Sequence, residues 1–251
     1  MEIKQIYTGC LAQGSYYIKC NGEAAIVDPL REVQQYIDMA EKDGVKIKYV
    51  FETHFHADFV SGHVTLAEKT GAEIIYGPTA KTGFDSIIAE DGQKFKVGKL
   101  EIEVLHTPGH TMESSCFLLY DKRGNQHSLF SGDTVFLGDV GRPDLAQKAV
   151  DMTPEHLAGM LFDSIRAKIM PLNDNVIIYP GHGAGSAGMR FRVLPVCWCA
   201  GRGRFHRTAH PSIYDNLQFG VARNTPGICK GTGSAYTARY SSTLLPFSVA
   251  R

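Results

Sequence analysis

Apolar and polar residues alternate in short runs along much of the chain, which is the pattern of β-strands with one buried face. Near the start, this alternation predicts strands at residues 3–7, 15–19 and 24–27. Asn21-Gly22 between the second and third of them predicts a hairpin turn. Further strands are predicted at residues 47–51, 73–76, 94–97, 100–105, 114–120, 127–130 and 175–179.

Three other segments carry the spacing of amphipathic helices. They are predicted at residues 31–43, 61–69 and 153–169. Gly44 suits the end of the first, while Thr153 as N-cap and Pro154 at the first helical position suit the start of the third. Residues 77–92 show neither pattern and predict a loop. Strands and helices in this order predict two mixed β-sheets packed face to face, with helices outside.

The composition is that of a globular protein, with 251 residues of which 43% are hydrophobic. A formal net charge of zero gives no reason to expect a nucleic-acid partner. The first residues show no secretion signal, and no apolar run approaches the roughly 18–20 residues of a membrane helix. Six scattered cysteines without a Cys-x-x-Cys pair predict reduced thiols and a cytoplasmic protein, with Cys10, Cys20 and Cys116 buried as small apolar residues.

The charge changes abruptly near residue 187. Residues 188–251 hold eight arginines and one lysine against a single acid, Asp215, although the whole chain balances 26 bases with 26 acids. We therefore expect a catalytic domain at residues 1–187 and an atypical basic tail at 188–251. The tail is open to three interpretations: an out-of-frame and disordered end, a genuine basic extension, or a divergent pair of helices.

Histidine and aspartate cluster where four predicted strands end. The clusters are Thr53-His54-Phe55-His56-Ala57-Asp58, Pro108-Gly109-His110-Thr111, Ser131-Gly132-Asp133-Thr134 and Pro180-Gly181-His182-Gly183. Imidazoles and carboxylates suit Zn(II) or Fe(II), and the absence of cysteine from the set argues against a structural zinc site. A single such histidine could be a hydrogen-bonded turn residue, but the four clusters together predict one metal site.

These four motifs resemble those of the metallo-β-lactamase superfamily, over residues 1 to about 187. The resemblance implies an α/β fold, the four-layer αββα sandwich, with the metal site at one edge of the sheets. Dinuclear members carry a histidine directly after the aspartate of the first motif, and here that position is Phe59. Phenylalanine cannot coordinate a metal, and His63 replaces it only if the following helix turns it back. A mononuclear site is therefore favoured.

Within the superfamily, the chain resembles the persulfide dioxygenases, also called sulfur dioxygenases. The stretches 7–16 and 55–63 are similar to the bacterial members in which this domain precedes rhodanese-like sulfurtransferase modules. The resemblance implies one Fe(II) per chain, bound by His54, His110 and Asp133. It leaves three residues as hydrogen-bonding neighbours in a vestigial second site: His56, Asp58 and His182.

The same resemblance implies catalytic roles for Asp58 and for Arg142, which lies in the stretch Gly141-Arg142-Pro143-Asp144. Arg142 could pair with a carboxylate of a glutathione-like substrate, or it could simply brace the loop by pairing with Asp144. The implied reaction is oxidation by O2 of the terminal sulfur of a low-molecular-weight persulfide to sulfite, in sulfide metabolism.

Two other functions remain open. One is glyoxalase II-like hydrolysis of a thioester by a zinc-bound hydroxide, which uses the same ligands. The other is a binding module that has lost catalysis, against which the complete set of three ligands counts. Expected partners are the small-molecule substrate, O2, a rhodanese-like sulfurtransferase and a second copy of the chain in a homodimer.

Overall fold

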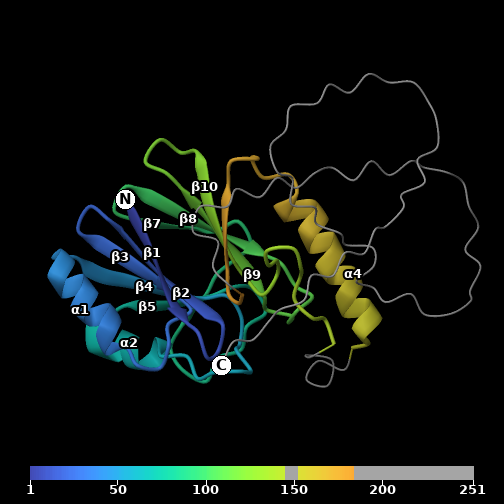
Figure 1. Ribbon diagram of the computed structural model, residues 1–251, viewed down its shortest axis with the longest axis horizontal. Coiled ribbons are helices and arrows are strands. Elements are labelled where there is room, and N and C mark those ends of the chain that lie inside the picture. Colours follow the sequence, from blue (N-terminus) through green and yellow to red (C-terminus); the bar gives the residue numbers. More distant parts are fainter. Residues whose placement is uncertain (145–151, 184–251) are drawn as a thin grey trace, which may run out of the picture. The chain divides into compact units, whose positions relative to one another are not determined.

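The computed structural model describes residues 1–144 and 152–183, and two β-sheets form its centre (Figure 1). The first sheet has the strand order β1-β2-β3-β4-β5-β6 and the second the order β11-β10-β9-β8-β7. The first consists of β1 (Glu2–Thr8), β2 (Gln13–Cys20), β3 (Glu23–Val27), β4 (Lys46–Glu52), β5 (Glu73–Tyr76) and β6 (Ile87–Ile88). The second consists of β7 (Lys94–Val97), β8 (Leu100–His106), β9 (Ser115–Tyr120), β10 (Gln126–Gly132) and β11 (Ile177–Pro180).

Both sheets are mixed, as predicted. In the first, β1, β2 and β3 pair antiparallel, and the pairs from β3 to β6 are parallel. In the second, only the pair of β10 and β11 is parallel. The predicted loop at residues 77–92 is wrong at one point, because Ile87 and Ile88 form the short strand β6 against β5. A strand of two residues is too short to show the alternation of apolar and polar residues by which strands are predicted.

The helices lie close to their predicted positions. They are α1 (Gln34–Asp43), α2 (His63–Thr70), α4 (Pro154–Ser164) and the π-helical turn η1 (Ile165–Ile169) that continues α4. Gly44 ends α1 with a left-handed φ of 62°, a conformation that glycine adopts without steric cost. Thr153 caps α4 by accepting a hydrogen bond from the His156 amide. The predicted start of the first helix at residue 31 is three residues too early.

The alternation along the strands sorts the apolar side chains into three layers of core. Between the sheets lie residues such as Ile18, Phe51, Phe117 and Phe130, all of them inaccessible to solvent. The outer face of the first sheet packs on α1 and α2, and that of the second sheet packs on α4 and η1. Helices therefore cover both outer faces (Figure 1), and the predicted αββα sandwich is confirmed.

The prediction for the cysteines is correct at two of three positions. Cys20 and Cys116 are buried, but Cys10 is exposed in the turn between β1 and β2, so the predicted burial of Cys10 was wrong.

The basic tail at 188–251 lies outside the described residues, as does the domain boundary at 187, and both stay predictions. Within residues 1–144 and 152–183, no helix is long and apolar enough to cross a membrane.

Candidate metal centre

The four predicted clusters lie at the ends of strands from both sheets. His54 follows β4 of the first sheet, while His110 and Asp133 follow β8 and β10 of the second. His182 follows β11, which pairs parallel to β10 so that Gly132 lies opposite Pro180. The fold therefore brings residues that are far apart in sequence to one edge of the sandwich.

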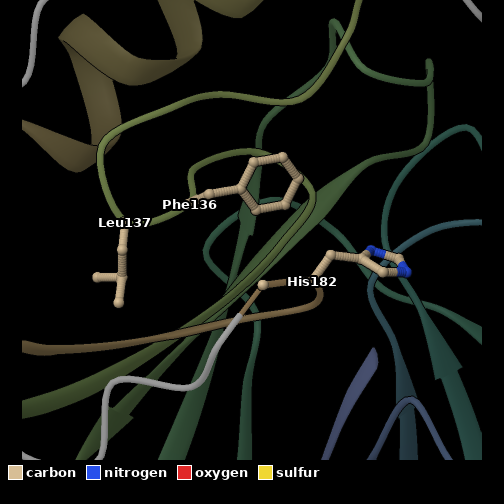
Figure 2. Close-up of a pocket in the computed structure, with 4 residues that line it drawn as sticks. Phe136, Leu137 and His182 are labelled. Carbon is tan, nitrogen blue, oxygen red and sulfur yellow. The ribbon is translucent and has the colours of Figure 1, made fainter. Parts of the chain in front are cut away.

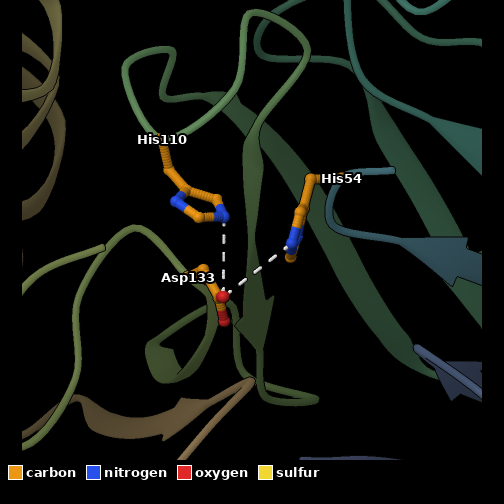
Figure 3. Close-up of side chains that lie close together, drawn as sticks. All are labelled: His54, His110 and Asp133. Atoms are coloured by element: carbon orange, nitrogen blue, oxygen red, sulfur yellow. Dashed lines mark ion pairs between the residues drawn. The ribbon is translucent and has the colours of Figure 1, made fainter. Parts of the chain in front are cut away.

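Three side chains at this edge point toward one another (Figure 3). Asp133 Oδ2 lies 3.5 Å from His110 Nε2 and 3.9 Å from His54 Nε2, and the three donor atoms fall within 4.8 Å of one another. The side chains of His54, His110 and Asp133 are 3%, 9% and 11% exposed. Two imidazoles and one carboxylate facing a common point form a donor set that fits Fe(II) with open positions, and also Zn(II).

The second nitrogen of each of these imidazoles is held by the protein. His110 Nδ1 lies 2.9 Å from the carbonyl oxygen of Arg142. Since a carbonyl only accepts hydrogen bonds, Nδ1 carries the proton and Nε2 keeps its lone pair. His54 Nδ1 lies 3.0 Å from Thr53 Oγ1, and burial holds the pKa of His54 well below its usual value. The ring of His110 is thus prepared to bind a metal through Nε2, whereas the tautomer of His54 depends on the direction of its hydrogen bond with the Thr53 hydroxyl.

His182 is engaged through both ring nitrogens. Nδ1 lies 2.7 Å from Asp133 Oδ1, and Nε2 lies 2.8 Å from Asp58 Oδ2. Since carboxylates accept, both nitrogens donate, and the hydrogen bond to Asp133 is the main cause that raises the pKa of His182 to about 9. Asp58 and His182 are therefore bonded to each other, and the second oxygen of Asp133 is taken by His182.

The rings of His56 and Phe59, from the first motif, are not part of the three-donor group, although the His56 ring lies 4.3 Å from the ring of His54. The ring of Phe59 lies 4.3 Å from the ring of His56. His56 Nε2 is directed to Asp28 Oδ1 at 3.1 Å and to Glu52 Oε2 at 3.6 Å. The expected role of His56 as a hydrogen-bonding neighbour of the metal stays a prediction; its ion pairs are with Asp28 and Glu52, and Asp28 is linked to His54 through Thr53.

His63 does not return to the site as a replacement for the missing histidine. Its Nδ1 lies 3.7 Å from Glu52 Oε1, and its ring packs 4.8 Å from that of Phe84. The helix α2, which begins at His63, directs this side chain toward the first sheet.

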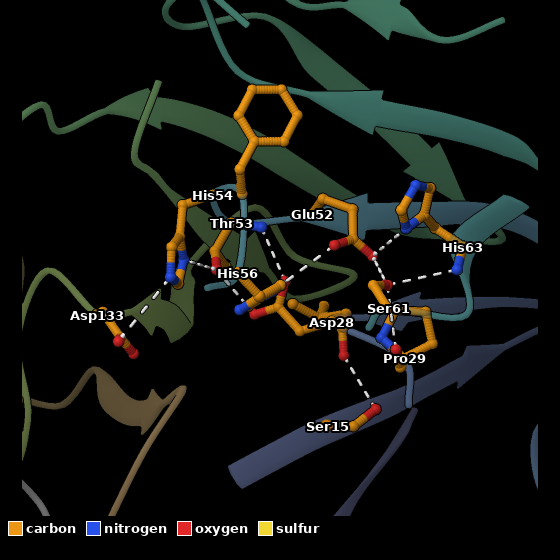
Figure 4. A network of polar contacts seen from close by, with 12 residues as sticks. Ser15, Asp28, Pro29, Glu52, Thr53, His54, His56, Ser61, His63 and Asp133 are labelled. Atoms are coloured by element: carbon orange, nitrogen blue, oxygen red, sulfur yellow. Dashed lines mark hydrogen bonds and ion pairs between the residues drawn. The ribbon is translucent and has the colours of Figure 1, made fainter. Parts of the chain in front are cut away.

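A buried polar network behind the first motif was missed in the sequence (Figure 4). Asp28, Glu52 and Thr53 are 1%, 0% and 2% exposed. Burial raises the pKa of Glu52 to about 8. Burial also opposes charge on His56 and Asp28, but the attraction between the two groups is stronger. This attraction raises the pKa of His56 to about 9 and lowers the pKa of Asp28.

A signal for this network was present in the sequence. Asp28 directly follows an apolar strand and Glu52 ends another, and β3 and β4 are parallel neighbours with Val27 opposite Phe51. Carboxylates at the ends of adjacent parallel strands meet at the same sheet edge, just as the metal-ligand clusters do.

A pocket of about 340 Å³ opens beside the candidate metal centre. It is lined by Phe136, Leu137, His182 and Gly183 (Figure 2). The two apolar side chains come from the loop after β10, and His182 connects the pocket to Asp133. Of the pocket-lining residues, His182 is the one that contacts the candidate centre.

Arg142 pairs with Asp144 in the structure. Its Nε and terminal nitrogen lie 3.1 and 2.7 Å from the two carboxylate oxygens of Asp144, and 60% of the Arg142 side chain is exposed. The loop brace considered in the sequence is therefore present. The arginine also serves the centre through its backbone, since its carbonyl oxygen holds His110.

Comparison with known proteins identifies the family to which the chain is similar. The family model described as Metallo-beta-lactamase superfamily matches residues 8–182. A probable hydroxyacylglutathione hydrolase of Schizosaccharomyces pombe is 30% identical over 192 residues, which cover 74% of this chain and 70% of that protein. The mitochondrial persulfide dioxygenase ETHE1 of Bos taurus is also 30% identical, over 163 residues covering 64% of this chain and 59% of that protein.

Among solved structures, a metallo-beta-lactamase from Staphylococcus aureus subsp. aureus COL is 40% identical to the chain, with a TM-score of 0.67. The match covers 74% of this chain but only 56% of the staphylococcal one.

Proposed function

The chain belongs to the metallo-beta-lactamase superfamily, and within that family we propose that it is a mononuclear non-haem iron persulfide dioxygenase. Two observations support this proposal: the donors of His54, His110 and Asp133 converge on one point, and Phe59 stands directly after Asp58, where dinuclear members carry a histidine. The other donors near that position, Asp58 and His182, are bonded to each other. Among the described residues, a second metal beside the three donors would therefore have to break the hydrogen bond between Asp58 and His182. The other group of possible donors, Asp28, Glu52 and His56, is already joined by ion pairs.

The proposed reaction converts a glutathione-type or other low-molecular-weight persulfide, O2 and water into the free thiol, bisulfite and a proton. Atoms and charge balance as RSSH + O2 + H2O → RSH + HSO3⁻ + H⁺. Iron(II) bound by His54, His110 and Asp133 would supply open coordination positions and the electron transfer that O2 requires.

The chain's own side chains orient the substrate and exclude water. Phe136 and Leu137 line the pocket that would receive the persulfide, and their apolar surfaces limit the access of water. Arg142 stands near the centre with an exposed guanidinium that could leave Asp144 to bind a substrate carboxylate. Asp58 holds a proton at His182 Nε2, and in this proposal it is the catalytic carboxylate.

A zinc-dependent thioester hydrolase is the second candidate function. The fission yeast hydrolase and the bovine dioxygenase are both 30% identical to the chain, so similarity alone favours neither. Hydrolysis would be catalysed by a metal-activated water and fits the same three donors. Phe59 in place of a ligand is the feature that favours the dioxygenase.

The proposal includes two partners and a location. The partners are a rhodanese-like sulfurtransferase that supplies or consumes persulfide and a second copy of the chain in a homodimer, and the location is the cytoplasm.

Both reactions should be assayed with the same preparation. One assay measures the sulfite formed from glutathione persulfide under air, and the other measures the hydrolysis of lactoylglutathione. We expect sulfite formation that Asp133→Asn abolishes. The matched control is Glu113→Gln, because Glu113 is a buried carboxylate that accepts a hydrogen bond from the Phe55 amide at 2.9 Å and is not one of the three donors. Hydrolysis without sulfite formation would show that the thioester hydrolase is the correct function.

A further inference from the structure

We propose that Thr53 is a positioning residue, which together with Asp28 fixes the tautomer and the orientation of His54. The inference rests on the proposed role of His54 as a metal ligand, but not on which metal is bound or which reaction follows. It accounts for a buried hydroxyl and a buried carboxylate that the proposed function does not use.

The first step is the contact between Asp28 and Thr53 (Figure 4). Asp28 Oδ1 accepts a hydrogen bond from the Thr53 amide, and Asp28 Oδ2 accepts one from Thr53 Oγ1, each at 2.8 Å. A hydroxyl has one proton to donate, and an ionised carboxylate can only accept. The single proton of Thr53 Oγ1 is therefore committed to Asp28.

The second step follows at His54. Thr53 Oγ1 lies 3.0 Å from His54 Nδ1 and, having donated its proton to Asp28, it can only accept there. His54 Nδ1 must then carry the ring proton. Its Nε2 is left with the lone pair, directed to the space beside Asp133 Oδ2. Asp28 thus acts on the ligand through the hydroxyl, as a carboxylate acts directly on a metal-bound histidine in other proteins.

His110 reaches the same state by a different contact. Its Nδ1 faces the Arg142 carbonyl, which can only accept. A threonine hydroxyl, unlike a carbonyl, could hold either tautomer of His54. Asp28 is what resolves this choice, which explains why a carboxylate is buried behind a residue that binds no metal itself.

Thr53 also contacts the strand end that carries Asp133. A Cβ atom on Gly132 would lie 2.5 Å from Thr53 Oγ1 and 3.0 Å from Thr53 Cγ2. Gly132 has a φ of +49° and directly precedes Asp133. The branched side chain of Thr53, which has few rotamers, therefore packs closely on the backbone next to one ligand while it bonds the other.

The test compares three variants at two threonines. Thr53→Val keeps the shape but removes the hydroxyl, and Thr53→Ser keeps the hydroxyl. Thr107→Val is the matched control, because Thr107 is fully buried and its hydroxyl lies 2.9 Å from Thr134 Oγ1, without contact to a histidine.

The first readout is long-range ¹H–¹⁵N NMR of the metal-free protein, which distinguishes the two tautomers of each histidine ring. We expect the Nδ1–H form of His54 in the wild type, in Thr53→Ser and in Thr107→Val, and a mixture of tautomers in Thr53→Val. The second readout is Co²⁺ affinity by chelator competition. It should fall about 10–100-fold in Thr53→Val only.

Asp28→Asn provides a second test of the direction of the hydrogen bonds. An amide in place of the carboxylate can donate to Thr53 Oγ1, which frees the hydroxyl proton for His54 Nδ1 and should move the ring to the Nε2–H form. It also keeps the proposal testable if Thr53→Val does not fold. An unchanged tautomer and unchanged Co²⁺ affinity in the folded variants would overturn the proposal. Absence of persulfide oxidation in a protein with the expected tautomers would instead overturn only the proposed function.

Discussion

Gly141 is the residue at which a single methyl group should disturb the centre most. It is buried against the chain that carries Asp133, and a Cβ atom there would lie 1.9 Å from the Asp133 carbonyl oxygen and 3.1 Å from His110 Cγ. Real Cβ atoms essentially never approach closer than 3.0 Å, so the two segments must separate by at least about 1.1 Å, the difference between 3.0 and 1.9 Å.

This displacement sets the expected size of the effect of Gly141→Ala. Overpacking of this kind costs about 1–3 kcal/mol of stability. A misplacement of roughly 1 Å near a reacting centre can cost about 100-fold in rate. We therefore expect a modest fall in the free energy of unfolding together with a loss of about 100-fold in kcat/KM for persulfide oxidation.

The assay measures urea unfolding, metal content and kcat/KM for the same preparations. Gly159→Ala is the matched control, because Gly159 sits inside α4 and, apart from its chain neighbours and the backbone of its own helix, no atom lies within 4 Å of its added Cβ. In a helix this change should stabilise by about 0.5–1 kcal/mol and leave the activity unchanged. A Gly141→Ala protein with wild-type metal content and kcat/KM would refute the reasoning, since it would show that the two segments separate without moving the donors.

Three other substitutions and modifications test separate parts of the account. Phe59→His should add a donor beside Asp58, and we expect a second metal per chain by elemental analysis and increased thioester hydrolysis; unchanged metal content would contradict this. Arg142→Ala should raise KM for glutathione persulfide with little change in kcat or in melting temperature, because an exposed ion pair contributes only about 0–1 kcal/mol; an unchanged KM would restrict Arg142 to its backbone role. At pH 8 an alkylating reagent should modify Cys10, which is exposed, but not Cys116, because burial raises the pKa of the Cys116 thiol to about 11 and keeps it protonated. Peptide mass spectrometry measures the modification of each cysteine, and alkylation of Cys116 would contradict the prediction.

The layers of the fold could be predicted because the sequence of each strand or helix shows, by its own pattern of apolar residues, which face is buried. Alternation in β9, for example, places Phe117 in the core between the sheets and Leu118 against the helices. Gly44 and Thr153 mark helix ends through their own backbone preferences. The strand β6 left no such record, since its two residues pair only because β5 offers an open edge.

In the candidate centre, too, some residue positions could be predicted from the sequence and others could not. His54, His110 and Asp133 each follow a predicted strand, so their approach to one another could be expected from the fold. The position of His56 could not, because alternation within a loop does not show which neighbour the ring faces. Its contact with Asp28 depends on the parallel pairing of β3 and β4, which are separated by a helix.

The number of irons and the consumption of O2, measured on one anaerobically purified preparation, test the central claim most directly. Iron and zinc per chain are determined by elemental analysis, and O2 uptake is followed after addition of glutathione persulfide. A mononuclear persulfide dioxygenase predicts one iron per chain and one O2 consumed for each sulfite formed. Two zinc ions per chain, hydrolysis of lactoylglutathione and no persulfide-dependent O2 uptake would contradict it.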